Sequence, residues 1–215
     1  MTAPDPDQFE MRRLESLSNT IFGVAMTLLA NDLPKSEAFK SSPDWGDLYQ
    51  AYSGRMSSFA LSFIIAGVFW ISHHRRLARQ PYGSRGAVIV NLLFLLSILL
   101  LPASNSLDNS YGMSSAVAVL FGLHLTTIAA LNAWLWWLVL GSWQHEVVVS
   151  LFPIVVLLSG TIVAGIAPQY AGYLWLLAFG TLLFRRVVAS PGANGERALM
   201  SSQVSRQTHW PAGRA

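Results

Sequence analysis

The sequence predicts an all-α membrane protein, with six transmembrane helices in one domain. Hydrophobic residues make up 53% of the 215 residues and charged residues only 12%, whereas an average soluble domain carries about 25% charged residues. Several apolar stretches approach the roughly 20 residues that cross a bilayer as a helix. The chain has no Cys, which excludes a disulfide framework, a thiolate nucleophile and a cysteine metal site.

The apolar stretches divide the chain into a membrane domain with polar ends. Residues 1–11 form a polar lead predicted to be disordered, residues 12–188 form the membrane domain, and residues 189–215 form a disordered tail. We expect a loop rich in Ser and Asn at 102–112 and a short turn at Pro168, without an internal repeat. The predicted helices are 13–33, 48–77, 86–101, 113–140, 147–166 and 170–187.

The distribution of basic residues predicts the topology. Six spans place both termini on one side, and the termini with the second and fourth interhelical connections hold 11 of the 14 Lys and Arg residues. By the positive-inside rule this side, with both termini, is cytoplasmic. The opposite side carries more Asp and Glu than Lys and Arg, which favours cations near it. The tryptophans at 134, 136, 137 and 143 are expected to form an interfacial belt.

The predicted first helix is unusually polar for a membrane span. Polar side chains in such helices usually face a bundle interior or a water-filled path rather than lipid. At about 100° per residue, one stripe of this helix carries Arg13, Leu17, Thr20, Val24, Thr27, Leu28 and Asn31. This stripe is a candidate pore lining, and ordinary hydrogen bonding between helices is the alternative interpretation.

Two short patterns resemble the endolysosomal potassium channel family and its bacterial relatives. The segment RLESLSN at residues 13–19 is followed by TLL at 27–29, and Trp70 precedes His73 in the family's Trp-x-x-His spacing. The family's Phe-Ser-Asp is Leu17-Ser18-Asn19 here, so a signature carboxylate is replaced by an amide. An amide still accepts and donates hydrogen bonds but carries no negative charge.

The resemblance implies a homotetramer whose first helices surround a central pore. It implies aliphatic rings at Val24 and Leu28, a Thr27 ring connected with potassium preference, and Asn31 at a third ring that is usually aliphatic. Thr20 lies on the same stripe. A second group of residues would form a network between the first two helices. In the first helix this network includes Asn19, which points about 140° away from Val24 around the helix axis. That group is Arg13, Ser18, Asn19, Trp70 and His73.

The predicted function is therefore passive, potassium-preferring conduction in a bacterial plasma membrane. The partners are copies of the chain, lipid and monovalent cations, without nucleic acid, cofactor or any metal beyond transient K⁺. A secondary transporter and a non-conducting scaffold are the alternatives. An enzyme is not expected, since no Asp or Glu lies at the centre of any predicted span. Without the resemblance, the favoured interpretation of His73 and His74 is that they belong to an interfacial basic cluster. His124 and Asn132 are expected to form hydrogen bonds inside the bundle.

Overall fold

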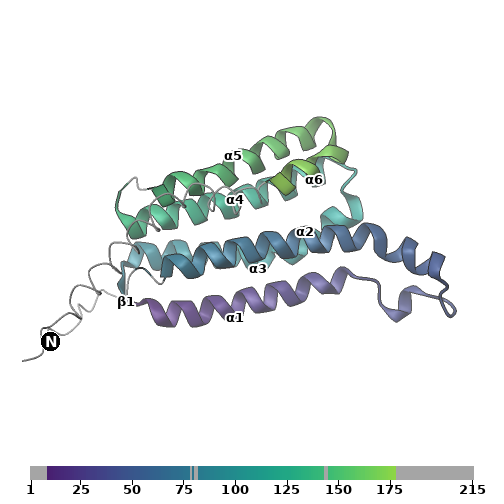
Figure 1. The fold of residues 1–215 in the computed structure, drawn as a ribbon, viewed down its shortest axis with the longest axis horizontal. Helices are drawn as coiled ribbons and strands as arrows, with labels where there is room; N and C mark the ends of the chain where they lie inside the picture. Colours follow the sequence, from purple (N-terminus) through teal and green to yellow (C-terminus); the bar gives the residue numbers. More distant parts are fainter. Residues whose placement is uncertain (1–8, 78, 80–81, 143–144, 178–215) are drawn as a thin grey trace, which may run out of the picture. The chain divides into compact units, whose positions relative to one another are not determined.

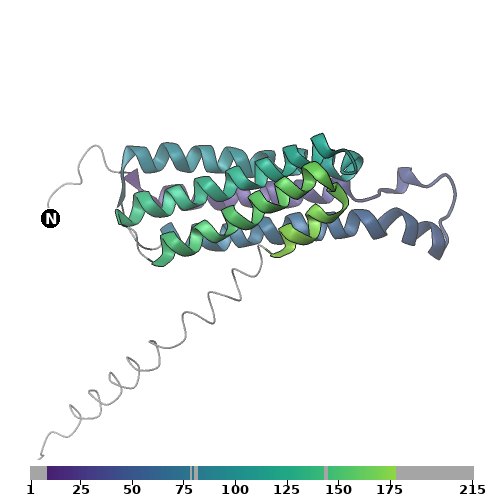
Figure 2. The same ribbon diagram turned by 90° about the horizontal axis from the view of Figure 1, so that it is seen from above.

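The computed structural model describes residues 9–77, 79, 82–142 and 145–177, and within them the chain is almost entirely helical. Helices α1 to α5 run back and forth along a common direction, with the short α6 folded against α5 (Figure 1, Figure 2). The six described α-helices are α1 (Met11–Leu29), α2 (Trp45–Leu77), α3 (Arg85–Tyr111), α4 (Ser115–Leu140), α5 (His145–Ile166) and α6 (Pro168–Leu177).

Hydropathy distinguishes α1 from the helices that follow it. Among the described residues, four helices are long and apolar enough to cross a membrane, namely α2, α3, α4 and α5. Helix α1 has 19 residues and is not among them, which agrees with the polar stripe predicted for it. Helix α6 is described over 10 residues, and the rest of its predicted span lies outside the described residues. The prediction of an all-α membrane fold is confirmed.

The ends of the helices follow local capping chemistry. Asp44 and Asp47 exchange hydrogen bonds at the start of α2, with each side chain accepting from the other's backbone N–H at 2.8 and 3.1 Å. This capping satisfies donors that the first helical turn leaves open. Helix α4 ends at Gly141, whose φ of +63° is the left-handed conformation that glycine adopts most easily. Pro168 begins α6 instead of forming the predicted turn, because the first helical position needs no backbone N–H bond.

The predicted loop at 102–112 is wrong. Helix α3 continues through Pro102 to Tyr111. The polar residues that favoured a loop make contacts with other helices: Ser104 Oγ lies 2.7 Å from His124 Nδ1, and Asn105 is 1% exposed. A proline inside a membrane helix is tolerated when neighbouring groups satisfy the backbone. Tertiary hydrogen bonds therefore stabilise a helix that local propensity disfavours.

The arginine-containing α2–α3 connection lies at the same end of the bundle as the start of α1 and the start of α5. Strand β1 (Phe9–Glu10) pairs antiparallel with strand β2 (Tyr82–Gly83), which brings the start of α1 beside the α2–α3 connection. Arg79 Nη2 in that connection lies 2.6 Å from Glu146 Oε1 at the start of α5. Of the residues predicted to form the lead, 9–10 are in β1 and residue 11 begins α1. Residues 1–8 and the predicted tail at 189–215 are outside the described residues.

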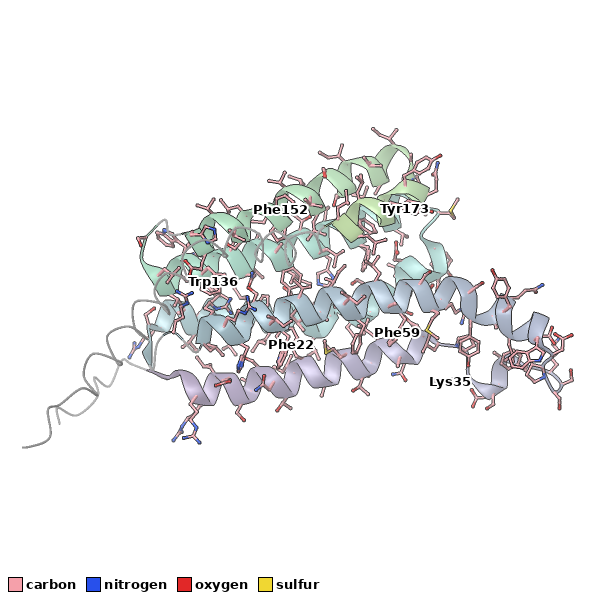
Figure 3. All side chains as sticks on the ribbon, in the orientation of Figure 1. Phe22, Lys35, Phe59, Trp136, Phe152 and Tyr173 are labelled. Carbon is pink, nitrogen blue, oxygen red and sulfur yellow. The ribbon has the colours of Figure 1, made fainter. Side chains whose placement is uncertain are left out.

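A continuous apolar core joins the helices (Figure 3). Phe22 of α1, Phe94 of α3 and Phe121 of α4 are each 2% exposed or less. Helices α4, α5 and α6 approach closely at two glycines: a Cβ on Gly122 would lie 2.3 Å from Thr161 Oγ1, and one on Gly160 would lie 2.6 Å from the Trp175 ring. Glycine allows this approach because it has no side chain. The core thus holds one face of α1 against a rigid group of helices.

Candidate functional site

Helix α1 has one face buried in its own chain. The buried side chains are Ser18, Phe22, Ala25 and Leu29, all 1% exposed or less. Their spacing of three or four residues puts them on one side of a helix. This side packs against α2 and α3. The opposite side of α1 is therefore available to something outside the chain.

The exposed face of α1 carries the predicted stripe. Val24 is 45% exposed and Leu28 is 39% exposed, and Thr20, Thr27 and Asn31 are also exposed. Thr27 Oγ1 donates to Gly23 O at 2.8 Å, and Thr20 Oγ1 donates to Ser16 O at 3.1 Å. A hydroxyl that donates to its own helix keeps its oxygen lone pairs available to a cation.

The exposed faces of α3 and α5 are different in character along their middle turns. Between residues 89 and 107 of α3 and residues 148 and 166 of α5, the large exposed side chains are apolar, as expected for surfaces in contact with lipid. They are Ile89, Leu92, Leu93, Leu96, Leu99, Leu100 and Leu107 on α3 and Val148, Leu151, Phe152, Val155, Leu158, Ile162 and Ile166 on α5. The exposed face of α1 instead mixes hydroxyl and amide groups with three aliphatic side chains, Leu17, Val24 and Leu28, which is typical of a surface that faces water or other protein.

A buried polar contact joins α1 to α2 and α3. His73 Nε2 lies 2.7 Å from Asn91 Oδ1 and 3.3 Å from Ser18 Oγ. The Ser18 hydroxyl donates to Leu14 O at 2.6 Å, so its oxygen faces the ring as an acceptor. Both neighbours of Nε2 are acceptors, and we therefore assign the ring proton to Nε2. The ring also stacks on Phe94, with centroids 5.5 Å apart.

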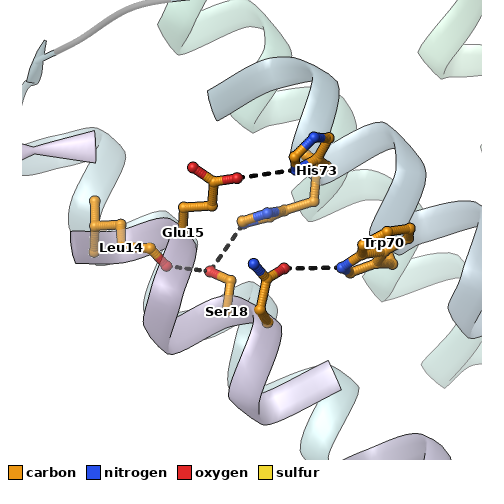
Figure 4. Close-up of polar contacts among 7 residues, drawn as sticks. Leu14, Glu15, Ser18, Trp70 and His73 are labelled. Carbon is orange, nitrogen blue, oxygen red and sulfur yellow. Dashed lines mark hydrogen bonds and ion pairs between the residues drawn. The ribbon is translucent and has the colours of Figure 1, made fainter. Parts of the chain in front are cut away.

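A second set of contacts lies on the exposed side of the same helix pair (Figure 4). Trp70 Nε1 donates to Asn19 Oδ1 at 2.9 Å. His74 Nδ1 lies 3.0 Å from Glu15 Oε1, and the His74 ring stacks on Trp70 with centroids 5.7 Å apart. The structure thus brings Ser18 and Asn19 to the two residues of the Trp-x-x-His element. Arg13 lies exposed at the start of α1.

The Asn19 contact leads to a stability prediction. Replacing Asn19 by Asp keeps an oxygen that accepts from Trp70, and we expect a free energy of unfolding within about 0.5 kcal/mol of the parent. Replacing Asn19 by Leu removes the acceptor, and we expect a loss of about 1 kcal/mol. Unfolding by SDS titration in mixed micelles measures both values. An equal loss in the two variants would show that the Trp70 bond does not contribute.

Several buried polar residues were not predicted as part of a site. Asn91 was visible only as a polar exception in an apolar span. Arg76 is 1% exposed and donates from Nη1 to Asn132 Oδ1 at 3.0 Å, although its position beside Arg75 indicated an interfacial cluster. Trp136, predicted to lie in an interfacial belt, is also 1% exposed and donates to Ser72 Oγ at 3.0 Å. One signal was present in the sequence: polar residues recurring at helical spacing near the end of α2.

His124 and Asn132 of α4 form hydrogen bonds inside the bundle, as predicted. His124 Nε2 lies 3.0 Å from Ser97 O, and Asn132 contacts Ser72 and Arg76 of α2. They face different partners and do not form one site. The described residues contain no group of three or more His, Cys, Asp or Glu that could hold a metal ion.

Comparison with known proteins relates the chain to potassium channels. Residues 13–102 match the family model described as endosomal/lysosomal potassium channel TMEM175. A curated potassium channel of Streptomyces collinus is 27% identical over 135 residues, which is 60% of this chain and 64% of the relative. The chain thus aligns with slightly less than two thirds of that relative's length. The resemblance to the TMEM175 potassium channel family is confirmed.

The fold of this TMEM175-like chain has also been seen in a solved structure. The crystal structure of a homologue of the lysosomal potassium-selective channel TMEM175, from Chamaesiphon minutus, matches with a TM-score of 0.68. That match covers 80% of this chain and 96% of the other at 21% identity. The family model spans α1, α2 and most of α3, so it includes the exposed stripe and the polar contacts. The family and both relatives are channels by name and not enzymes, as expected for this chain.

Proposed function

We propose that the chain is a potassium-preferring cation channel in which four copies surround a central pore lined by the exposed stripe of α1. The observation that carries the proposal is the contrast between faces: α1 exposes Thr20, Thr27 and Asn31, whereas α3 and α5 expose mainly large apolar side chains. A polar face in a membrane bundle is stable against water or protein and costly against lipid. The match of residues 13–102 to a potassium channel family supports the same assignment.

The stripe suggests how conduction is controlled. Rings of Val24 and Leu28, one side chain from each copy, form apolar constrictions that resist ions because water leaves them readily. Four Thr27 hydroxyls replace part of the hydration shell of an ion. Potassium loses water more easily than sodium, so a weak ring of this kind favours potassium modestly. Asn31 keeps the outer constriction hydrated.

The proposed setting is a bacterial plasma membrane with both termini in the cytoplasm. The arginine-rich end of the bundle, where Arg79 meets Glu146, then faces the cytoplasm. The opposite end, with Asp32 and Glu37 near Asn31, faces outside. The proposed channel uses no cofactor, and K⁺ is its permeant ion.

Replacing Thr27 by Val tests this function. In liposomes loaded with potassium, we expect the parent to pass potassium faster than sodium, and Thr27→Val to lower this ratio about threefold because the hydroxyl ring is lost. Thr127→Val is the matched control. Thr127 is also exposed, on α4, and its hydroxyl donates to Leu123 O at 2.9 Å in the same i−4 geometry.

The outcomes separate the candidate functions. An equal fall in both variants would place selectivity outside the α1 stripe. Absence of flux from folded parent protein, with an ionophore control confirming the gradient, would favour a non-conducting scaffold. Saturable flux coupled to a second gradient would favour a transporter.

A further inference from the structure

The outer end of α1 is held by hydrogen bonds at the point where its regular helix stops. The α-helix ends at Leu29, and residues Ala30–Asp32 form a 3₁₀ turn before Leu33 becomes extended. Leu29 is fully buried, and Pro34 is also buried. Asn31 lies between these two anchors and is exposed. The direction of its side chain therefore depends on how the 3₁₀ turn is held.

Asn105 of α3 makes the contacts that hold this turn. Its Nδ2 donates to Asp32 Oδ2 at 3.1 Å. Its Oδ1 accepts from Ser58 Oγ at 3.2 Å and from Ser62 Oγ, both on α2. A carboxylate only accepts, so Asp32 determines which end of the amide faces it. The buried amide thus connects α1, α2 and α3 at one point.

The middle of the turn borders a hollow, while packing anchors its two ends at Leu29 and Pro34. The hollow has a volume of about 430 Å³, with Asn31, Asp32, Lys35, Arg55 and Asn109 in its wall. Within the turn, Leu33 N–H donates to Ala30 O at 3.2 Å. The Asp32 side chain is held by Asn105, and the Tyr52 hydroxyl donates to Pro34 O at 2.7 Å.

We infer that Asn105 is a positioning residue for the outer constriction of the pore, and that it acts through Asp32 to set the direction of Asn31. In a 3₁₀ turn neighbouring side chains point about 120° apart. Holding Asp32 toward α3 therefore turns Asn31 away from the bundle, onto the exposed stripe. The inference rests on the proposed function for the role of Asn31, whereas the holding contact itself is independent of conduction.

A competing explanation gives Asp32 a purely electrostatic role. A carboxylate at the outer mouth attracts cations whether or not it forms a hydrogen bond with Asn105. Asp32→Asn separates the two explanations, because its amide oxygen still accepts from Asn105 while the charge is gone. Asp32→Ala removes the charge and the acceptor together.

The test measures the accessibility of residue 31 in the full-length protein in liposomes. The chain has no Cys, so Asn31→Cys introduces a single thiol, and a neutral methanethiosulfonate reports its accessibility. The reagent reacts with the thiolate, whose population responds to a neighbouring charge, so the two Asp32 variants, which both lack the carboxylate, are compared with each other. We expect the modification rate in Asp32→Ala to differ about fivefold from that in Asp32→Asn, and the rate in Asn105→Leu to differ about fivefold from that in the Asn31→Cys parent, the size expected for loss of one hydrogen bond. Asn109→Leu, one turn further along α3 beside the same hollow, is the matched control and should leave the parent rate unchanged.

Each other result contradicts the inference. The inference is overturned if the thiol at position 31 is modified at equal rates in Asp32→Asn and Asp32→Ala. It is also overturned if the rates are equal in Asn105→Leu and its control Asn109→Leu, or if none of the four variants changes the rate. Because Asp32 is partly exposed, Asp32→Ala keeps the test valid when Asn105→Leu fails to fold. Current through Asn31→Cys channels tests the proposed function separately. If labelled protein conducts as before, residue 31 does not line the ion path, whatever the modification rates show.

Discussion

Replacing Leu28 by serine is expected to raise potassium flux through reconstituted protein by about tenfold, which corresponds to a barrier lower by about 1.4 kcal/mol. Leu28 is 39% exposed on the α1 stripe, one residue beyond Thr27. An apolar ring at this position opposes conduction by excluding water, and a ring of hydroxyls keeps water and ions in the constriction.

The matched control for this effect is Leu158→Ser. Leu158 is 42% exposed on α5, which lies on the other side of the bundle from α1 (Figure 1). The same substitution there places a hydroxyl against lipid and should leave flux per folded protein unchanged. Flux is followed in potassium-loaded liposomes, normalised to the amount of folded protein. An unchanged or reduced flux in Leu28→Ser would place the constriction elsewhere.

Replacing His73 by alanine is expected to lower the free energy of unfolding by about 2–4 kcal/mol. The His73 ring is 2% exposed, lies 5.5 Å from Phe94 and 6.0 Å from Phe22 between ring centroids, and bonds to Asn91 at 2.7 Å. Alanine leaves a cavity and removes the proton that Asn91 accepts. Both losses act at the junction of α1, α2 and α3.

The neighbouring histidine provides the control. The His74 side chain is 51% exposed, and its 3.0 Å contact with Glu15 lies at the surface. Polar pairs at the surface contribute about 0–1 kcal/mol, so His74→Ala should lower the free energy of unfolding by less than about 1 kcal/mol. SDS titration in mixed micelles measures both variants. Similar losses for the two histidines would contradict the assignment of the buried role to His73 alone.

The polar contacts around α1 were partly predictable from the sequence. Asn19 and Trp70 were placed in one network by the resemblance, and the structure joins them at 2.9 Å. The direction of Asn19 followed from helical spacing, because 100° per residue separates it from the stripe. Asn91 was not assigned, because a single polar residue in an apolar span does not reveal its partner.

The segment at 102–112 shows where local reasoning fails. Proline, serine and asparagine favour turns because they restrict the backbone or compete for its hydrogen bonds. In the structure Asn105 bonds to α2 and to Asp32, and these partners lie far from it in the sequence. Their contribution exceeds a local preference that amounts to a few kcal/mol at most.

The sequence by itself determined the membrane class, the number of helices found in the described residues and the two faces of α1, because composition and helical period are local properties of the chain. Only the tertiary structure decided which polar groups meet. The burial of Arg76 and Trp136, the pairing of His73 with Asn91 and the attachment of Asp32 to Asn105 all depend on which helices become neighbours. That choice depends on packing over the whole bundle, since a buried polar group is stable only where another helix supplies its partner.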